Sequence, residues 1–181
     1  LCDQFLANLV NIFLSGIMHS TQADFLAQVE AHKGMIHKVC QVYCWNPGDR
    51  EDLFQEIIIQ LWKAWPGFRG ESKFSTWLYR IALNTAISGL RKQKNHLVYM
   101  EPEKLPAGLK DETDSEEKEE RLKQFYDAIR QLSELERAII MLYLEDKSYE
   151  EMEDILGVNQ NSLRVKMNRA KEKLRKITKQ S

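Results

Sequence analysis

The sequence is short of the features that mark secreted, membrane-spanning and catalytic proteins. Its 181 residues include only 3 cysteines. An odd number without framework spacing excludes a disulfide-stapled fold and predicts reduced thiols in a cytoplasmic protein. The apolar run 5–18 is too short to span a bilayer and is preceded by no basic segment, so neither membrane insertion nor a secretory signal is expected. No nucleotide-binding loop, catalytic triad or metal cluster stands out, so we predict neither an enzyme nor a cofactor.

Neither sign of charge is in excess, since the net charge is −1. The charged residues are nevertheless strongly segregated along the chain. Residues 63–94 hold seven basic residues against one acidic residue, and residues 158–181 hold eight against one. Between these blocks, residues 101–120 hold nine acidic residues against three basic ones. Folding alone does not require this arrangement, and the two basic blocks favour contact with nucleic acid.

The first 17 residues, LCDQFLANLVNIFLSGI, differ in composition from the rest of the chain. Met18 begins an ordinary soluble N-terminus, so we interpret residues 1–17 as upstream sequence that does not belong to the native protein. The alternative is an N-terminal helix that packs on the first domain. The intact mass of the natively expressed protein distinguishes the two.

Residues 18–94 are predicted to form a first, all-helical domain. The stretch Asn46-Pro47-Gly48-Asp49 has strong turn chemistry and is expected to end one helix. A second helix is predicted from about Glu51 to Trp65, with an inward face of Phe54, Ile58, Leu61 and Trp65. Its first turns carry Asp52, Gln55 and Glu56. A favourable interaction of the acidic residues with the helix dipole would explain their position without any further role.

The stretch 68–94 organises the first domain. A polar loop leads into a helix for which Ser75 or Thr76 is the expected N-cap. At about 100° per residue, one face collects an aromatic ring, two guanidinium groups, an amide and a hydroxyl: Trp77, Arg80, Asn84, Ser88 and Arg91. The opposite face, expected to pack inward, carries Tyr79, Ala82, Leu83, Ala86 and Leu90. The side chains on the polar face suit contacts with phosphates, base edges and stacked bases. A solvated basic helix face is the simpler alternative.

Two cysteines and a histidine share one predicted helix. Cys40 and Cys44 lie one turn apart, and His37 lies one turn before Cys40, so a metal site can be imagined there. Structural zinc usually needs four ligands at tighter spacing. We therefore interpret the thiols as part of a packing face and predict no metal.

Residues 95–120 are predicted to be an acidic, flexible linker. Two prolines interrupt helical patterning there, and the acidic run favours an extended chain. About 25 residues at ~3.3 Å each would span up to ~80 Å. A tether with no further role is the alternative.

Residues 121–181 are predicted to form a second helical domain. One helix is marked by Leu122, Phe125, Ile129 and Leu132, and the next is expected to bury Ala138, Ile139, Leu142 and Tyr143. Capping boxes begin at Ser133 and Ser148, and Gly157 is the expected left-handed residue after a short helix. A short helix, a glycine-containing turn and a longer basic helix together indicate a helix-turn-helix.

The last helix is predicted to read duplex DNA. Leu163, Met167, Ala170 and Leu174 form its buried stripe. Polar and small residues project from the far side, where Asn161, Ser162 and Val165 are expected in the major groove and Asn168 beside them. The expected phosphate contacts are Arg164, Lys166, Arg169 and Lys173. A three-helix packing unit with a basic surface is the alternative.

Three runs resemble bacterial RNA polymerase sigma factors of the sigma-70 superfamily, in the extracytoplasmic-function (ECF) group. They are DREDLFQEIIIQLWKAWPGFRGESKFSTWLYRIALN, LSELERAIIMLYLEDKSYEEMEDILG and SLRVKMNRAKEKLRK. The resemblance implies a first domain that binds the polymerase clamp and melts and reads the minus-ten promoter element. It implies a second domain that reads the minus-thirty-five element. Both domains are covered, in the family's order, with the acidic segment between them.

The resemblance also assigns roles to individual residues. Asp52, Gln55 and Glu56 match the helix that faces core polymerase. The loop from Phe68 to Phe74, including Arg69 and Lys73, matches the one that captures a flipped base. An anti-sigma factor is a further partner that the group allows, although no residues here identify one.

Two other functions remain as alternatives. One is a helix-turn-helix transcription regulator without stable polymerase binding, which leaves the 68–94 stretch unexplained. The other is a nucleic-acid-modifying enzyme that uses His37 and Cys40, which metal analysis would test.

Overall fold

The computed structural model describes residues 19–96 and 124–178, and every regular element in these ranges is helical. The segments predicted as leader (1–17) and most of the predicted linker (95–120) lie outside them. The elements are α2 (His19–Tyr43), α3 (Pro47–Ala64), the 3₁₀ helix η1 (Trp65–Gly67), α4 (Phe74–His96), a helical stretch at 124–130, α6 (Glu134–Leu144), α7 (Tyr149–Leu156) and α8 (Gln160–Thr178).

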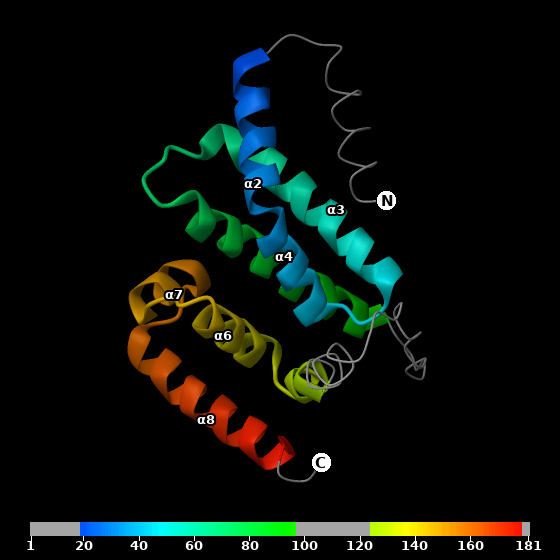
Figure 1. Ribbon diagram of the computed structural model, residues 1–181, viewed down its shortest axis with the longest axis vertical. Helices are drawn as coiled ribbons and strands as arrows, with labels where there is room; N and C mark the ends of the chain where they lie inside the picture. Colours follow the sequence, from blue (N-terminus) through cyan, green and yellow to red (C-terminus); the bar gives the residue numbers. More distant parts are fainter. Residues whose placement is uncertain (1–18, 97–123, 179–181) are drawn as a thin grey trace, which may run out of the picture.

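The first domain is built from α2, α3 and α4, each of which packs against the other two (Figure 1). The predicted inward faces are buried, except that Trp65 and Leu90 are only partly so. Burying a large apolar side chain contributes roughly 1.5–3 kcal/mol. The largest fully buried side chains of this domain are Tyr43, Tyr79, Phe54, Ile36, Ile57, Leu61, Leu78 and Leu83.

The predicted turn at residues 46–49 proved to be the start of α3. The Asn46 side chain accepts a hydrogen bond from the Gly48 amide at 2.9 Å, and Pro47 occupies the first helical turn. Proline is favoured there because its fixed φ suits a helix and its missing N–H would have no intrahelical partner. The same residues that break one helix therefore cap the next, four residues earlier than predicted.

The predicted N-cap of α4 was wrong. The helix begins at Phe74, so Ser75 and Thr76 lie inside its first turn. The Lys73 carbonyl accepts the amides of Thr76 and Trp77 at 3.0 and 3.2 Å. Phe74 packs among the aromatic rings of Trp65, Phe68 and Trp77, and this packing fixes where the loop ends. At its other end α4 continues to His96, two residues past residue 94.

The second domain contains α6, α7 and α8, with α8 packed on both of the others. The capping boxes at Ser133 and Ser148 are confirmed, with both reciprocal hydrogen bonds present in each. Gly157 has φ 65° and ends α7 in the left-handed region, which costs a glycine little. The chain then turns into α8, so α7 and α8 form the predicted helix-turn-helix.

One inward residue of α6 was predicted wrongly. Tyr143 is 44% exposed, whereas its neighbours Ile140, Met141 and Leu142 are buried. Most of the circumference of α6 is covered by the rest of the protein, and Tyr143 falls on the remaining open strip.

The two domains touch each other. α7 packs against α4, and α6 lies beside α2. Figure 1 shows α8 on the side of the second domain that faces away from α2 and α3. None of the described helices is both long and apolar enough to cross a membrane.

Candidate nucleic-acid interface

Four aromatic rings cluster where the loop 68–73 joins α4. Phe68 stacks on Trp65 with ring centroids 5.6 Å apart and lies 4.9 Å from Trp77. Phe74 lies 5.4 Å from Trp77 and 5.7 Å from Phe68. All four are only partly buried. Rings held in this way keep their orientation while part of each surface stays open to a stacked base.

The loop beside this cluster places two cations at the surface. Gly70 has φ 72°, a backbone conformation that favours glycine and that turns the loop. Arg69 and Lys73 on either side are exposed. The Lys73 ammonium lies 3.6 Å from a carboxylate oxygen of Glu151 in the second domain.

The polar face of α4 continues from the aromatic cluster. Arg80, Asn84 and Ser88 are exposed, while Tyr79, Ala82, Leu83 and Ala86 on the opposite face are buried. The helical period thus separates a packing face from a polar face as the sequence predicted. The side chain of Arg91 lies outside the described residues.

The face of α3 that the resemblance assigns to core polymerase points outward. Asp52 and Glu56 are exposed and Gln55 is partly exposed. The Gln60 amide donates to Glu56 at 2.7 Å. Ile59, one turn after Gln55, is 38% exposed. The sequence analysis did not single out Ile59, although its spacing from Asp52 and Gln55 is a signal that it shares their face.

The N-terminal turn of α8 is held by the residue before it. The Asn159 side chain accepts the Ser162 amide at 2.9 Å, which stabilises the helix start. Asn161 is exposed, Ser162 is partly exposed and Val165 is 50% exposed. The three residues predicted to meet base edges therefore lie at the open surface of one helix end.

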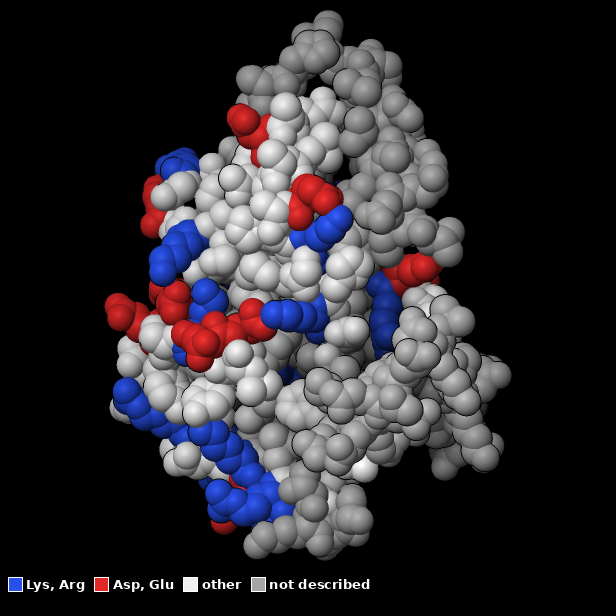
Figure 2. Space-filling model, viewed as in Figure 1, with Lys and Arg blue, Asp and Glu red and all other residues white. Residues whose placement is uncertain are grey.

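The cations of α8 form a continuous stripe (Figure 2). Arg164 and Arg169 are exposed beside exposed Asn168, and Lys166 is partly buried. The Arg164 guanidinium lies 5.0 Å from the centre of the Tyr149 ring, and Lys171 lies 4.0 Å from that of Tyr143. These cation–π contacts orient the side chains along α8. Tyr143 and Tyr149 were not predicted to take part.

Lys173 differs from the other predicted phosphate contacts. Its ammonium lies 2.8 Å from both carboxylate oxygens of Glu136. One of these oxygens, Oε2, also accepts hydrogen bonds from the amide and the hydroxyl of Ser133. Burial would raise the pKa of Glu136, but the bonds from Lys173 and Ser133 outweigh it and hold the pKa below its ordinary value. Lys173 therefore joins α8 to the start of α6.

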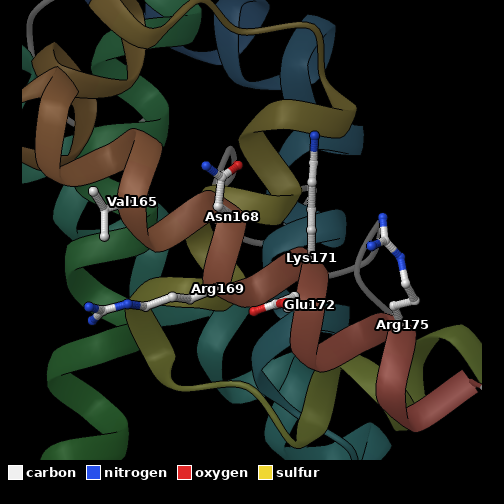
Figure 3. Close-up of a pocket in the computed structure, with 6 residues that line it drawn as sticks. All are labelled: Val165, Asn168, Arg169, Lys171, Glu172 and Arg175. Atoms are coloured by element: carbon white, nitrogen blue, oxygen red, sulfur yellow. The ribbon is translucent and has the colours of Figure 1, made fainter.

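A surface pocket follows α8 beyond its N-terminal half. Figure 3 shows Arg169 extending away from Lys171, with Asn168 between them. The pocket is lined by Val165, Asn168, Arg169, Lys171, Glu172 and Arg175. Three of these six residues are cations and one is an amide, a set that suits phosphate oxygens or base edges.

The three residues considered as metal ligands differ in exposure: His37 is exposed, Cys40 is buried, and Cys44, one residue after the end of α2, is partly buried. His37 stacks on Phe54 with centroids 4.6 Å apart. Burial, followed by the nearby Asp49, raises the pKa of the Cys44 thiol to about 11. A thiol with so high a pKa is protonated at neutral pH. Within the described ranges, no three potential metal-binding side chains come together.

Comparison with known proteins assigns the family. Residues 28–96 match the family model for sigma-70 region 2, and residues 122–174 match that for sigma-70 region 4. The chain therefore belongs to the sigma-70 family of RNA polymerase sigma factors. Within that family it falls in the ECF group. It is 36% identical over 136 residues to the ECF RNA polymerase sigma-E factor of Escherichia coli, a match covering 69% of this chain and 71% of the relative.

A second relative is matched over only part of its length. The chain is 35% identical over 88 residues to the ECF RNA polymerase sigma factor SigG of Mycobacterium tuberculosis, covering 49% of this chain but 22% of the relative. Two solved structures share the fold. Sigma factor RpoE bound to the anti-sigma factor NepR from Bartonella quintana has a TM-score of 0.70 at 22% identity, covering 86% of this chain and 97% of that one. CnrH bound to the cytosolic domain of CnrY has a TM-score of 0.65 at 20% identity, covering 99% of each.

Proposed function

We propose that the chain binds core RNA polymerase, directs it to specific promoters and promotes DNA melting. The observation that carries this is the pairing, in one sigma-70 family member, of two unlike DNA-facing surfaces. One combines an aromatic cluster with the polar face of α4. The other is a helix-turn-helix whose second helix is cationic. The chain has no catalytic role of its own in this proposal, and it acts in the cytoplasm.

The division of labour follows the predicted domains. Residues 18–94 bind polymerase and the minus-ten element, residues 95–120 form the acidic linker, and residues 121–181 bind the minus-thirty-five element. Phe68, Phe74 and Trp77 would stack on bases of the separated strand, while Arg80, Asn84 and Ser88 contact its edges and backbone. Unstacking a base costs a few kcal/mol. A pocket that accepts it therefore stabilises open DNA.

Binding of the polymerase is assigned to the outer face of α3. Asp52, Gln55 and Glu56 provide its polar groups, and exposed Ile59 adds apolar area beside them. Copurification with core polymerase tests this assignment. A stable complex supports it, whereas a helix-turn-helix regulator of the ordinary kind would bind duplex DNA without one.

An anti-sigma factor is a further proposed partner, because the structural relative RpoE is bound to the anti-sigma factor NepR. In vitro transcription with core polymerase on a promoter library tests the whole proposal. Transcripts that depend on the added chain and share two upstream sequence elements are expected. Transcription that is unchanged by the chain would contradict the proposal.

A further inference from the structure

A side-chain hydrogen bond ties the first residue of α8 to α7. The amide nitrogen of Gln160, Nε2, donates to the Oε2 carboxylate oxygen of Glu153 at 3.0 Å. The two residues are 7 positions apart, and the left-handed turn at Gly157 lies between them. Both side chains are partly exposed. The contact therefore spans the turn of the helix-turn-helix, and neither residue was predicted to take part in DNA binding.

A carboxylate decides which end of the Gln160 amide it meets. An ionised carboxylate only accepts hydrogen bonds, whereas a glutamine amide has a donating nitrogen on one side and an accepting oxygen on the other. The amide nitrogen of Gln160 therefore faces Glu153, and its oxygen, Oε1, is directed away. The reverse orientation would lose a hydrogen bond to a charged group, which is stronger than a bond between neutral groups. Glu153 thus holds the amide in one of its two orientations.

Gln160 lies next to residues that are predicted to meet base edges. Asn161 follows it and is exposed, and Ser162 is partly exposed. Side chains of an α-helix tilt toward its N-terminus, so the long Gln160 side chain extends past the start of α8. A recognition helix enters the major groove with its N-terminal residues against the base edges, while the preceding helix crosses the backbone. Gln160 is therefore at the end of α8 that enters the groove.

The orientation of the amide decides which bases Gln160 can read. In the major groove, adenine and cytosine present an exocyclic amino group, which donates, whereas guanine and thymine present a carbonyl oxygen, which accepts. The outward oxygen of Gln160 accepts from the first two bases and repels the other two. Its nitrogen carries a second hydrogen, which can donate to N7 of adenine, so adenine offers two hydrogen bonds.

We propose that Gln160 determines the base preference at one position of the minus-thirty-five element, and that Glu153 is the positioning residue that sets its amide. The pair selects a base with an exocyclic amino group. A base without one should lower the affinity about 10-fold or more. The consequence for promoter choice rests on the proposed function, whereas the preference itself is a property of duplex binding by the chain.

Reversal of the base preference is the direct test. The full chain is used to select binding sites from a library of random DNA duplexes, and the recovered sites are sequenced. Gln160→Ala identifies the relevant position as the one where preference is lost. Glu153→Lys replaces an acceptor by a donor, so the ammonium should hold the Gln160 oxygen and direct the amide nitrogen into the groove. The favoured base at that position should change from adenine or cytosine to guanine or thymine.

Two control variants separate this effect from charge and from folding. Asp154, one position after Glu153, is exposed. Asp154→Lys makes the same change of charge and should raise the affinity for all sequences without changing any base preference. Glu153→Gln keeps the size of the side chain and can either donate or accept, so the preference should relax at that position alone. Circular dichroism verifies that each variant is folded.

Three selection outcomes would overturn the inference. One is a wild-type chain with no preference at the position. Another is a Gln160→Ala variant whose affinity falls equally for all sequences, which would make Gln160 a phosphate contact. The third is a folded Glu153→Lys variant that keeps the wild-type preference. If that variant does not fold, Glu153→Gln decides, and an unchanged preference in it would have the same meaning.

Transcription separates this inference from the proposed function. A chain that shows the reversal in duplex binding but supports no promoter-dependent transcription would contradict the proposed function and leave the role of Glu153 and Gln160 standing. Transcripts that depend on the chain, from promoters without a preference at that position, would do the opposite.

Discussion

Helices α4 and α8 both present polar faces outward, yet their surroundings differ in a way that, in the proposed function, suits different forms of DNA. α4 begins at a cluster of four aromatic rings, Trp65, Phe68, Phe74 and Trp77. On α8 the aromatic partners, Tyr143 and Tyr149, come from neighbouring helices and lie under cations. Rings with open faces suit unstacked bases, whereas cations aligned along a helix suit duplex phosphates. Two helical domains of similar size thus differ mainly in what surrounds one exposed helix.

The largest expected effect comes from removing the central ring of the α4 surface. Trp77→Ala should reduce promoter opening about 10- to 100-fold, because stacking contributes ~1–3 kcal/mol per base. Polymerase binding should persist. Permanganate reactivity of promoter thymines measures opening, and copurification measures polymerase binding. Trp62→Ala, which removes a ring that packs on Phe25, is the matched control for lost packing. Loss of polymerase binding by Trp77→Ala alone would show that the two surfaces are not separate.

The second-largest expected effect is a loss of stability at low pH that is greater in the second domain than in the first. Among the described residues, Glu136 is the one buried carboxylate, and it belongs to the second domain. The pKa of Glu136 is lower in the folded than in the unfolded protein. Its contribution to the free energy of unfolding is therefore complete above the unfolded pKa of ~4.3 and is lost as pH falls through the folded pKa. Glu136→Gln should lower stability by about 1–3 kcal/mol at neutral pH, with the difference from wild type shrinking in acid.

Urea unfolding at several pH values measures this effect. All 4 tryptophans lie in the first domain: Trp45, Trp62, Trp65 and Trp77. Their fluorescence follows mainly that domain, although Trp45 also contacts Arg130 and Arg137 of the second, while circular dichroism follows both. The helical signal of wild type should fall in acid before the fluorescence changes. Glu151→Gln is the control, since Glu151 closes the other capping box but is more exposed. Equal losses of stability in Glu136→Gln and Glu151→Gln would contradict a special role for the contact between Lys173 and Glu136.

A smaller effect is expected within α8. Arg169→Ala should weaken duplex binding for all sequences and reduce the slope of log affinity against log salt by about one. Lys173→Ala should change this slope much less, because its ammonium is held by Glu136, and should instead lower stability. Fluorescence anisotropy with duplex DNA measures both slopes. Equal slopes for the two variants would show that Lys173 leaves Glu136 to bind phosphate.

The smallest effect concerns the turn of the helix-turn-helix. Gly157→Ala places a side chain at φ 65° and should cost about 1 kcal/mol. Gly34→Ala, in the middle of α2 with no neighbouring atom within 4 Å, should stabilise the chain by roughly 0.5–1 kcal/mol. Chemical unfolding of both variants checks the opposite signs.

Local chemistry decided which parts of this fold the sequence could predict. The capping boxes at Ser133 and Ser148 and the left-handed Gly157 depend on residues within one helical turn, and all three are confirmed. Asn46 and Pro47 were misinterpreted because the same pair suits a turn and a helix start. Tyr143 was misplaced because a helix covered on most sides loses the periodic pattern that identifies its open strip.

The predicted site residues stay predictions. Those on α3, α4 and α8 whose side chains the structure describes lie at least partly at the surface, but Lys173 is paired with Glu136. The contacts between the two domains could not be predicted from the sequence. The hydrogen bonds from Tyr126 to Gln41 and from Lys38 to Glu145 join residues 85 and 107 positions apart, and no local pattern couples Trp45 to Arg130. Lys173 was assigned to DNA for a similar reason, since Glu136 lies 37 positions away.

Site-specific photocrosslinking tests the central claim most directly. Trp77 and Val165 would each be replaced, in separate variants, by the photoreactive residue p-benzoylphenylalanine. Each variant is then bound with core polymerase to a promoter recovered from the transcription library. We expect position 77 to crosslink to the unpaired minus-ten strand and position 165 to the duplex minus-thirty-five element. Crosslinks from both positions to one element, or from position 77 only to duplex DNA, would contradict two surfaces built for two forms of DNA.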